Sequence, residues 1–419
     1  MALTLRDLKT EARNLAHGGQ VPAALAAHEW MLAANPLDND SRRKVADLLW
    51  QLGDRDGALA VYRSCALHDT RSGHLLPALI GCKVLESLGQ RTDDIIGEMA
   101  RNYAHGSPAL GKFAARQAPV NLDTSVEPPP TATAPPADVG KLAQRALARA
   151  LDLSVFVQYP TQFLPVPFFS ELPPDLFVAA VRKLRLLRAG DGQVVFREGQ
   201  PGEAFYFVAA GELRVVGRDP RGQPIEWARL HEGAPFGELA LLTAEPRTAT
   251  VQVVGEADLL EIGRATIGEL VAAVPAVGER LERFAHERLL KNLLASSPLF
   301  KPFDPQQQMD LIRRFEGVDV AAGTTVIQEG AVGQGLFVIL MGNVEVLRGD
   351  QPLARLRAGE MFGEMSLLHD APTTASVRTL TPASLLFLGR DYFRRLVAAL
   401  PAMRKYFEDL AKSRSSGPA

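Results

Sequence analysis

The second half of the chain contains a long internal repeat, which constrains the fold more than any other feature. Phe196–Gly199 returns as Ile327–Gly330 at an offset of 131 residues. Phe236–Leu239 returns as Phe362–Met365 at an offset of 126, so the second copy is five residues shorter. Both copies alternate short β-branched and aromatic runs with glycine-rich turns, which is typical of strands. The repeat predicts two small β-barrels or jelly rolls, each with about eight strands.

A shorter period of 34 residues occupies the N-terminal part of the chain. It relates Ala12 to Ala46 and Gly19 to Gly53. This pattern resembles tetratricopeptide repeats, over about residues 5–117. Such arrays usually hold peptides or helices of partner proteins in a concave groove. The alternative is a helical bundle with accidental periodicity.

The resemblance to tetratricopeptide repeats is incomplete at one position of each repeat. Leu8 and Arg42 stand where that motif has a large aromatic side chain in the first helix. The motif is therefore degenerate.

Six prolines between Pro119 and Ala137 favour extended structure and cannot supply a core, so we expect a linker there. The predicted fold class is multidomain: an all-α region of tetratricopeptide-like repeats, followed by two β-barrels or jelly rolls with flanking helices. The predicted boundaries are 1–118 for the helical repeats, 119–140 for the linker, 141–296 for the first barrel, 297–412 for the second and 413–419 for a tail.

The charge and cysteine content exclude several classes of protein. The 46 Lys and Arg nearly balance the 48 Asp and Glu, so no overall field attracts nucleic acid or an anionic membrane. Cys65 and Cys82 are too few for a disulfide framework, and we expect them to be core thiols. No secretory signal and no apolar run of about 18 residues is found, so we expect a cytoplasmic protein.

No motif for catalysis or metal binding stands out in the sequence. The eight histidines are scattered, and no pair of histidines or cysteines has metal-ligand spacing. A cluster of a nucleophile with a base is also missing. We therefore expect neither an enzyme nor a protein with a metal or cofactor.

One segment of the first copy has the residue types of an anion site. Gly237 lets backbone amides approach an anion, and residues 238–242 can form one helical turn whose amides point at a phosphate. Glu238 is an acceptor suited to a ribose hydroxyl. Arg247 carries a planar fork of donors that matches phosphate oxygens. A small anionic ligand with a sugar is the physical interpretation.

This segment resembles the phosphate-binding cassette of the cyclic nucleotide-binding domain family, which includes the catabolite activator protein and the regulatory subunits of protein kinase A. The resemblance implies that Glu238 binds the ribose 2′-hydroxyl and that Arg247 binds the cyclic phosphate of cAMP or cGMP. The predicted ligand contacts are Phe236, Gly237, Glu238, Leu239, Ala240, Arg247, Thr248 and Ala249.

Thr248 leaves the choice of nucleotide open. Domains selective for cAMP usually have Ala after the arginine, whereas several domains that respond to cGMP have Thr. The hydroxyl of Thr248 can meet the guanine amino group, or it can satisfy only the backbone or the phosphate.

The second cassette departs from the first at the phosphate cation. Thr373 stands where the first copy has Arg247, although Glu364 is retained. A buried phosphate without a cation loses several kcal/mol, or more than about a hundredfold in affinity. We expect a degenerate copy used for packing, for a dimer contact or for another ligand such as cyclic di-GMP. Its candidate residues are Gly363, Glu364, Met365, Ser366, Thr373 and Thr374.

These observations lead to the hypothesis of a non-catalytic receptor for a cyclic mononucleotide. The first barrel would bind the ligand, the helix Ile267–Ser296 would act as its lid, and the helical repeats would bind an unknown protein partner. A similar helix, Tyr392–Lys412, follows the second barrel. We expect no nucleic-acid or membrane partner, and a homodimer is compatible with the sequence. The rival hypothesis is a constitutive scaffold in which both barrels bind proteins.

Overall fold

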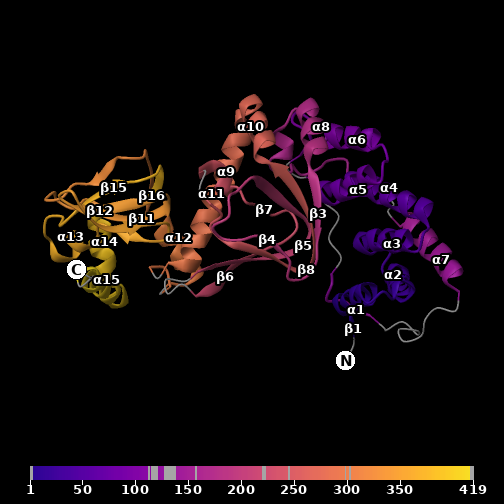
Figure 1. The fold of residues 1–419 in the computed structure, drawn as a ribbon, viewed down its shortest axis with the longest axis horizontal. Helices are drawn as coiled ribbons and strands as arrows, with labels where there is room; N and C mark the ends of the chain where they lie inside the picture. Colours follow the sequence, from indigo (N-terminus) through magenta and orange to yellow (C-terminus); the bar gives the residue numbers. More distant parts are fainter. Residues whose placement is uncertain are drawn as a thin grey trace.

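The computed structural model describes residues 3–111, 114, 121–126, 138–155, 158–218, 223–243, 246–297, 299–301 and 303–415. An N-terminal helical region packs against the first of two β-rich units, and the second unit lies at the opposite end of the molecule (Figure 1). This order confirms the predicted fold class. No helix in the described part of the chain is both long enough and apolar enough to span a bilayer.

The N-terminal region consists of helices joined by short turns. Gly19, Gly53 and Gly89 each follow a helix with φ between 75° and 89°, in the left-handed region that favours glycine. The recurring glycines of the sequence are thus turn residues, although the structure is only compatible with the tetratricopeptide type. The helices are α1 (Leu5–His17), α2 (Val21–Ala34), α3 (Asn39–Gln51), α4 (Arg55–Ser72), α5 (Leu75–Ser87) and α6 (Asp93–Tyr103).

Part of the predicted linker is paired with the N-terminus. Strand β2 (Ser125–Val126) lies antiparallel to β1 (Leu3–Thr4), just before α1. Residues 127–137 lie outside the described residues. Beyond them, α7 (Val139–Leu151) packs on α2, α3 and α4, although we predicted that it belongs with the first barrel.

Arg42 attaches α7 to the helical region. Its side chain is 1% exposed, and its guanidinium donates hydrogen bonds to the carbonyls of Arg149 (2.9 Å) and Ala150 (2.8 Å) at the end of α7. It also donates to the carbonyl of Pro36, between α2 and α3. The arginine that replaces the expected aromatic residue is therefore a buried clamp on α7.

The first β-rich unit is a strongly bent antiparallel sheet of six strands, in the order β3-β8-β5-β6, with β4 beside β8 and β7 beside β5. A glycine bends β5 at its centre: Gly211 has φ +90°, and a Cβ there would lie 2.1 Å from the carbonyl oxygen of Glu256. The elements are α8 (Pro174–Lys183), β3 (Arg185–Ala189), β4 (Val194–Phe196), β5 (Ala204–Arg218), β6 (Pro224–Leu230), β7 (Pro235–Phe236), α9 (Leu239–Thr243), β8 (Thr250–Gly263), α10 (Arg264–Ala273) and α11 (Pro275–Ser296), with a 3-10 turn at Phe169–Glu171.

The second unit has two four-stranded sheets, in the orders β10-β15-β12-β13 and β14-β11-β16-β9. We predicted about eight strands per copy, and the second copy has eight. The first copy has six, because β5 and β8 each continue through register shifts as one long strand. The elements are α12 (Pro305–Ile312), β9 (Glu316–Val320), β10 (Thr325–Ile327), β11 (Gly335–Met341), β12 (Val344–Arg348), β13 (Gln351–Leu356), β14 (Met361–Phe362), α13 (Glu364–His369), β15 (Ser376–Thr379), β16 (Ala383–Gly389), α14 (Arg390–Ala399) and α15 (Pro401–Ser415).

Each predicted terminal helix is in fact two helices. Pro275 and Pro401 begin α11 and α15, and they lie 126 residues apart, like the cassettes. Because proline lacks an N–H, it cannot continue the hydrogen bonding of the preceding helix, but it fits the first position of the next helix. The predicted tail begins inside α15, and residues 416–419 lie outside the described residues.

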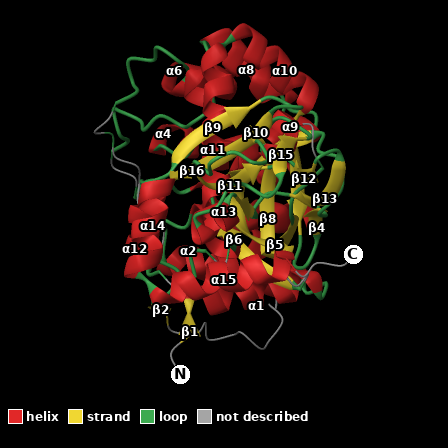
Figure 2. Ribbon diagram, turned by 90° about the vertical axis from the view of Figure 1, so that its left-hand side faces the viewer, coloured by secondary structure: helices red, strands yellow, loops and turns green. Residues whose placement is uncertain are grey.

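The helical region and the first barrel share one hydrophobic core, because α5 packs on β3 and β5. Ion pairs join the same surfaces, between Lys44 and Glu256 (2.7 Å) and between Arg188 and Asp47 (2.6 Å). We expected this region to present a groove to a partner, but the helices α3 and α5 face the barrel. At the far end, α8 lies between α6 and α10 (Figures 1 and 2).

Both cysteines are free and buried, as predicted for core thiols. Burial raises the pKa of Cys65 and of Cys82 to about 12, so both remain protonated at neutral pH. The described residues contain no group of three His, Cys, Asp or Glu side chains that could hold a metal ion.

A buried histidine in the helical core predicts acid sensitivity. Burial lowers the pKa of His28 in α2 to about 4, whereas the pKa of a histidine in the unfolded chain is about 6.5. Below about pH 6.5 the unfolded chain binds a proton that the folded chain refuses, so stability present above that pH is lost as the pH falls towards 4. Between pH 7 and 4.5 we expect His28→Gln to lose about 2–3 kcal/mol less stability than wild type in urea unfolding. Equal losses would contradict this assignment, because all other titrating groups are common to both proteins.

Candidate functional site

The first candidate cassette forms a tight turn between β7 and α9. Gly237 has φ +86°, and a Cβ at this position would lie 2.7 Å from Nη1 of Arg247 and 3.2 Å from the carbonyl oxygen of Ala204. No other residue would fit this turn without moving its neighbours. The glycine therefore brings the cassette backbone and the arginine together.

Arg247 is buried in this turn, with 5% of its surface exposed. Its guanidinium donates to the carbonyls of Gly237 (2.8 Å) and Ala204 (2.7 Å) and lies 4.1 Å from the centre of the Phe196 ring. Its Nε has no hydrogen-bond partner among the described residues, and burial lowers the pKa of the guanidinium. A buried cation held only by neutral groups and a ring can exchange them for an anion.

Glu238 is the second buried charged group of the cassette, with 2% of its surface exposed. Its Oε1 lies 3.9 Å from Nε of Arg288 in α11, and its Oε2 has no hydrogen-bond partner in the described structure. Burial raises the pKa of this carboxyl, and the Arg288 guanidinium opposes that rise. An unsatisfied buried acceptor is costly, and a hydroxyl donor would satisfy it.

One small cavity brings together all eight predicted contact residues, from Phe236–Ala240 and Arg247–Ala249. Its volume is about 50 Å³, which is room for one or two water molecules. A nucleotide can enter only if side chains around the cavity move. The sequence reasoning missed the remaining lining residues, which are Phe196, Val215, Leu230 and Val251 from the barrel wall and Arg288 and Asn292 from α11.

Helix α11 contacts the first cassette, and its role as a lid stays a prediction. Besides its contact with Glu238, Arg288 donates from Nη2 to the carbonyl of Pro235 (3.0 Å) at the start of the cassette. Sequence could have revealed this residue, because Arg414 lies 126 residues further on, at the same offset as the two cassettes.

The second cassette has the same backbone turn but different side-chain chemistry. Gly363 has φ +92°, like Gly237. The hydroxyl of Thr373 donates to the carbonyl of Gln328 (2.5 Å) and accepts from the amide of Ala331 (3.1 Å). The threonine thus closes a neutral turn and supplies no cation for a phosphate.

The retained glutamate of the second cassette is already paired. Glu364 is 1% exposed, and its Oε1 accepts from Nη1 of Arg414 in α15 (2.7 Å), while its Oε2 has no partner among the described residues. The Ser366 hydroxyl donates to the carbonyl of Gly363 (3.2 Å). Gly363–Ser366 lie at the start of α13, whereas Thr373 and Thr374 lie in the loop after it. Met365 is half-buried and Thr374 is exposed, so the six predicted residues do not all face one space.

Comparison with known proteins decides the family of the two β-rich units. Residues 186–273 and 318–399 match the family described as cyclic nucleotide-binding domain. Both units are cyclic nucleotide-binding domains. The matched segments include both cassettes and the helices α10 and α14, so the tandem arrangement predicted from the repeat is confirmed.

The two cyclic nucleotide-binding domains are also similar to curated regulatory proteins. The chain is 30% identical over 251 residues to the "cAMP-dependent protein kinase regulatory subunit" of Blastocladiella emersonii, covering 58% of this chain and 60% of that relative. It is 29% identical over 256 residues to the protein of the same description from Aspergillus fumigatus, with the same coverage. The chain thus spans about 60% of the length of these relatives.

Parts of the chain are also similar to solved structures. The regulatory domain of Toxoplasma gondii PKA with cAMP matches at 24% identity and a TM-score of 0.27, covering 60% of this chain and 93% of that one. The catabolite activator protein of Thermus thermophilus matches at 26% identity and a TM-score of 0.29, covering 35% of this chain and 63% of that one.

An arginine links the cassette of each cyclic nucleotide-binding domain to its terminal helices. Arg264, the first residue of α10, donates to the carbonyls of Gly202 (2.6 Å), Ala240 (2.5 Å) and Leu241 (3.0 Å). Its counterpart Arg390 donates to the carbonyl of Gly333 (3.0 Å) and forms an ion pair with Asp370 of the second cassette. A displacement of α9 would therefore pull directly on α10 in the first domain.

Proposed function

We propose that the first cyclic nucleotide-binding domain is a receptor for cAMP or cGMP and that the chain is a non-catalytic regulator. The observation that carries this proposal is the pair of incompletely satisfied buried groups, Arg247 and Glu238, facing one cavity in a glycine turn. A cyclic nucleotide offers a phosphate to the first group and a ribose hydroxyl to the second.

Binding would couple to the rest of the chain through α11. Because the cavity has only about 50 Å³, a nucleotide must displace Arg288 and the segment of α11 around it. The ligand can shift the position of α11 only by its difference in affinity for the two arrangements. Arg264 gives a second connection, from the cassette carbonyls to α10.

The choice between cAMP and cGMP belongs to the same proposal. The description of the curated relatives favours cAMP, whereas the exposed Thr248 at the edge of the cavity permits cGMP. We propose no cyclic mononucleotide for the second domain, because Thr373 brings no cation and Arg414 already pairs with Glu364.

A protein partner is also proposed, in agreement with the description of the relatives as kinase regulatory subunits. The helical region can meet such a partner only through surfaces other than the one that packs on β3 and β5.

The direct test is calorimetric titration of the full chain with cAMP, cGMP and cyclic di-GMP. We expect one site for a cyclic mononucleotide and none for cyclic di-GMP. The absence of heat with either mononucleotide would contradict the receptor proposal and favour the constitutive scaffold.

Removing Arg288 should make the first domain bind its nucleotide more tightly. Arg288 contacts the carboxylate that the ribose needs, and an ion pair of this length contributes up to about 1 kcal/mol. We therefore expect Arg288→Ala to raise the affinity about fivefold in the same titration. Arg414→Ala, which removes the equivalent lid arginine of the second domain, should leave that affinity unchanged. A weaker affinity in Arg288→Ala would show instead that this arginine contacts the bound nucleotide.

A further inference from the structure

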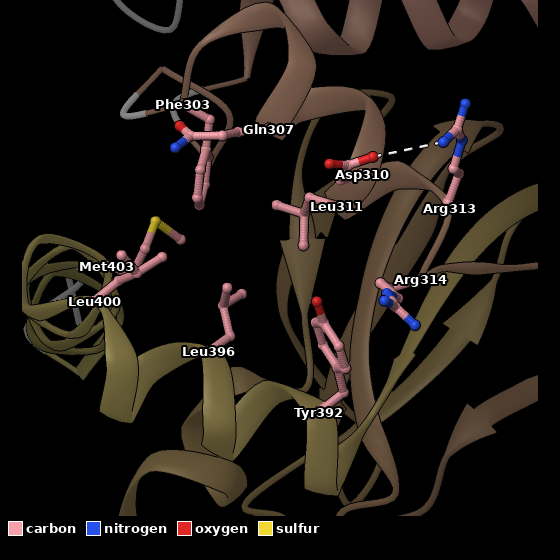
Figure 3. A pocket seen from close by; sticks show the side chains of 10 residues that line it. All are labelled: Phe303, Gln307, Asp310, Leu311, Arg313, Arg314, Tyr392, Leu396, Leu400 and Met403. Atoms are coloured by element: carbon pink, nitrogen blue, oxygen red, sulfur yellow. Dashed lines mark ion pairs between the residues drawn. The ribbon is translucent and has the colours of Figure 1, made fainter.

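The second cyclic nucleotide-binding domain has a groove that its cassette does not explain. The groove has a volume of about 740 Å³ and lies between α12 on one side and α14 and the start of α15 on the other. Figure 3 shows Phe303, Leu311 and Leu396 pointing into the space, with Met403 at its edge. Apolar side chains that line an open groove between helices are suited to a third apolar element.

The first domain shows what closes such a groove. There α8 and α10 pack directly on each other, and Lys183 on α8 forms an ion pair with Glu269 on α10. The internal repeat places Arg314 and Arg395 at these two positions of the second domain. Two cations repel each other, so this bridge between α12 and α14 cannot form.

A larger side chain on α12 also distinguishes the packing of α12 and α14 from that of α8 and α10. Ala180, on the buried side of α8, corresponds to Leu311 on α12. Leu311 therefore needs space where the first domain has a close contact, and it lines the groove.

The rim of the groove is basic. Arg314 lines the groove, and Arg395 lies beside the lining residue Tyr392. Their guanidinium carbons lie 5.7 and 5.9 Å from the centre of the Tyr392 ring, and neither side chain forms an ion pair among the described residues. Arg313 contacts Asp310 at 3.5 Å, with 70% and 60% of the two side chains exposed, so this pair is weak. The charge of the rim complements an acidic segment.

The chain itself shows which kind of segment packs beside such a helix. Helix α6 of the N-terminal helical region lies along α8, on the side away from α10, and its acidic first turn places Asp93 against Arg182. Arg182 is the counterpart of Arg313. The apolar face of α6, with Ile96 and Met99, enters the core that contains α8.

We propose that the groove between α12 and α14 docks an amphipathic helix of a partner protein, with an acidic first turn. The apolar face of this helix packs between Leu311 and Leu396, and its acidic turn lies against Arg313, Arg314 and Arg395. This surface is distinct from the cassette of the second domain, whose glutamate is paired with Arg414.

The test uses a peptide with the pattern of α6 as the probe. A fluorescein-labelled peptide of residues 92–105 is titrated into the full chain, and binding is followed by fluorescence anisotropy. We expect micromolar binding, and at least tenfold weaker binding of the peptide with Asp93→Lys and Asp94→Lys, since loss of rim charge complementarity weakens association.

Variants of the chain locate the site. We expect the double change Arg314→Glu and Arg395→Glu to weaken binding at least tenfold, and Leu396→Asp to abolish it. The matched control is Arg357→Glu, an exposed arginine of the same domain that does not line the groove. Far-UV circular dichroism establishes that each variant is folded.

Three results would overturn the proposal. The first is an absence of peptide binding up to millimolar concentration, and the second is binding that none of the groove variants weakens. The third is a wild-type dimer in sedimentation velocity that Leu396→Asp converts to a monomer, because a second copy of the chain would then cover the groove.

Discussion

Replacing Arg247 by alanine is expected to lower the affinity of the first domain for its cyclic nucleotide by more than about a hundredfold. Among the described residues that line the cavity, Arg247 is the buried cation, and Arg288 on α11 is a half-buried one. Without Arg247 the cassette turn itself offers the phosphate only backbone amides. The loss of one partner of a buried charge pair costs about 2–5 kcal/mol, which is roughly 30- to 5,000-fold in affinity and brackets this expectation.

Two further variants separate this role from a general loss of structure. Arg247→Lys keeps the charge but not the planar fork, so we expect an intermediate loss of about tenfold. Thr373→Ala changes the same position of the second cassette and should leave the affinity unaltered. Calorimetric titration at constant salt measures all three, and an Arg247→Ala protein with wild-type affinity would refute the assignment of this site.

The largest effect on stability is expected from Arg42→Met. The buried guanidinium joins the end of α7 to α3 and to the loop before α3, through three carbonyl groups. Methionine fills a similar volume but leaves these carbonyls without their donor, so we expect a loss of about 3–5 kcal/mol. Urea unfolding followed by the fluorescence of Trp30 and Trp50, which lie in α2 and α3, measures the change in this region.

Arg145→Met is the matched control for this experiment. Arg145 lies on the same helix α7, its side chain is 60% exposed, and its ion pair with Glu29 spans 3.9 Å. Its removal should cost less than about 0.5 kcal/mol. If the two variants lost the same stability, Arg42 would not be the clamp that holds α7.

The features on which sequence and structure agree are those encoded in short, contiguous patterns. The glycine turn with Glu238 and Arg247 lies within twelve residues. Its residue types have one physical explanation, which is that Gly237 lets the backbone and the Arg247 guanidinium approach the same cavity. The turn glycines of the helical repeat, such as Gly53, follow from their left-handed backbone in the same way.

The features that were missed depend on contacts between distant segments. An alanine-rich amphipathic pattern predicts that Val139–Leu151 is a helix, but not that it packs on α2 rather than on the barrel. The sequence did contain an indication of this packing, at Arg42. This buried residue is charged, whereas the repeat motif has a large aromatic side chain at its position. Likewise, the offset of 126 between Arg288 and Arg414 marks both lid arginines, although neither belongs to a local motif.

Helix α11 joins the two cyclic nucleotide-binding domains as one continuous helix of 22 residues. Val277 and Leu281 lie in the core of the first domain, and Leu293 lies in the core of the second. Between Leu281 and Leu293 the helix spans about 18 Å, so a tilt of about 10° around its first turns would carry the far end through about 3 Å. The fulcrum lies in the first domain and Arg288 lies partway along the helix. A small displacement at the nucleotide cavity would therefore produce a larger displacement of the second domain, without any contact between that domain and the ligand.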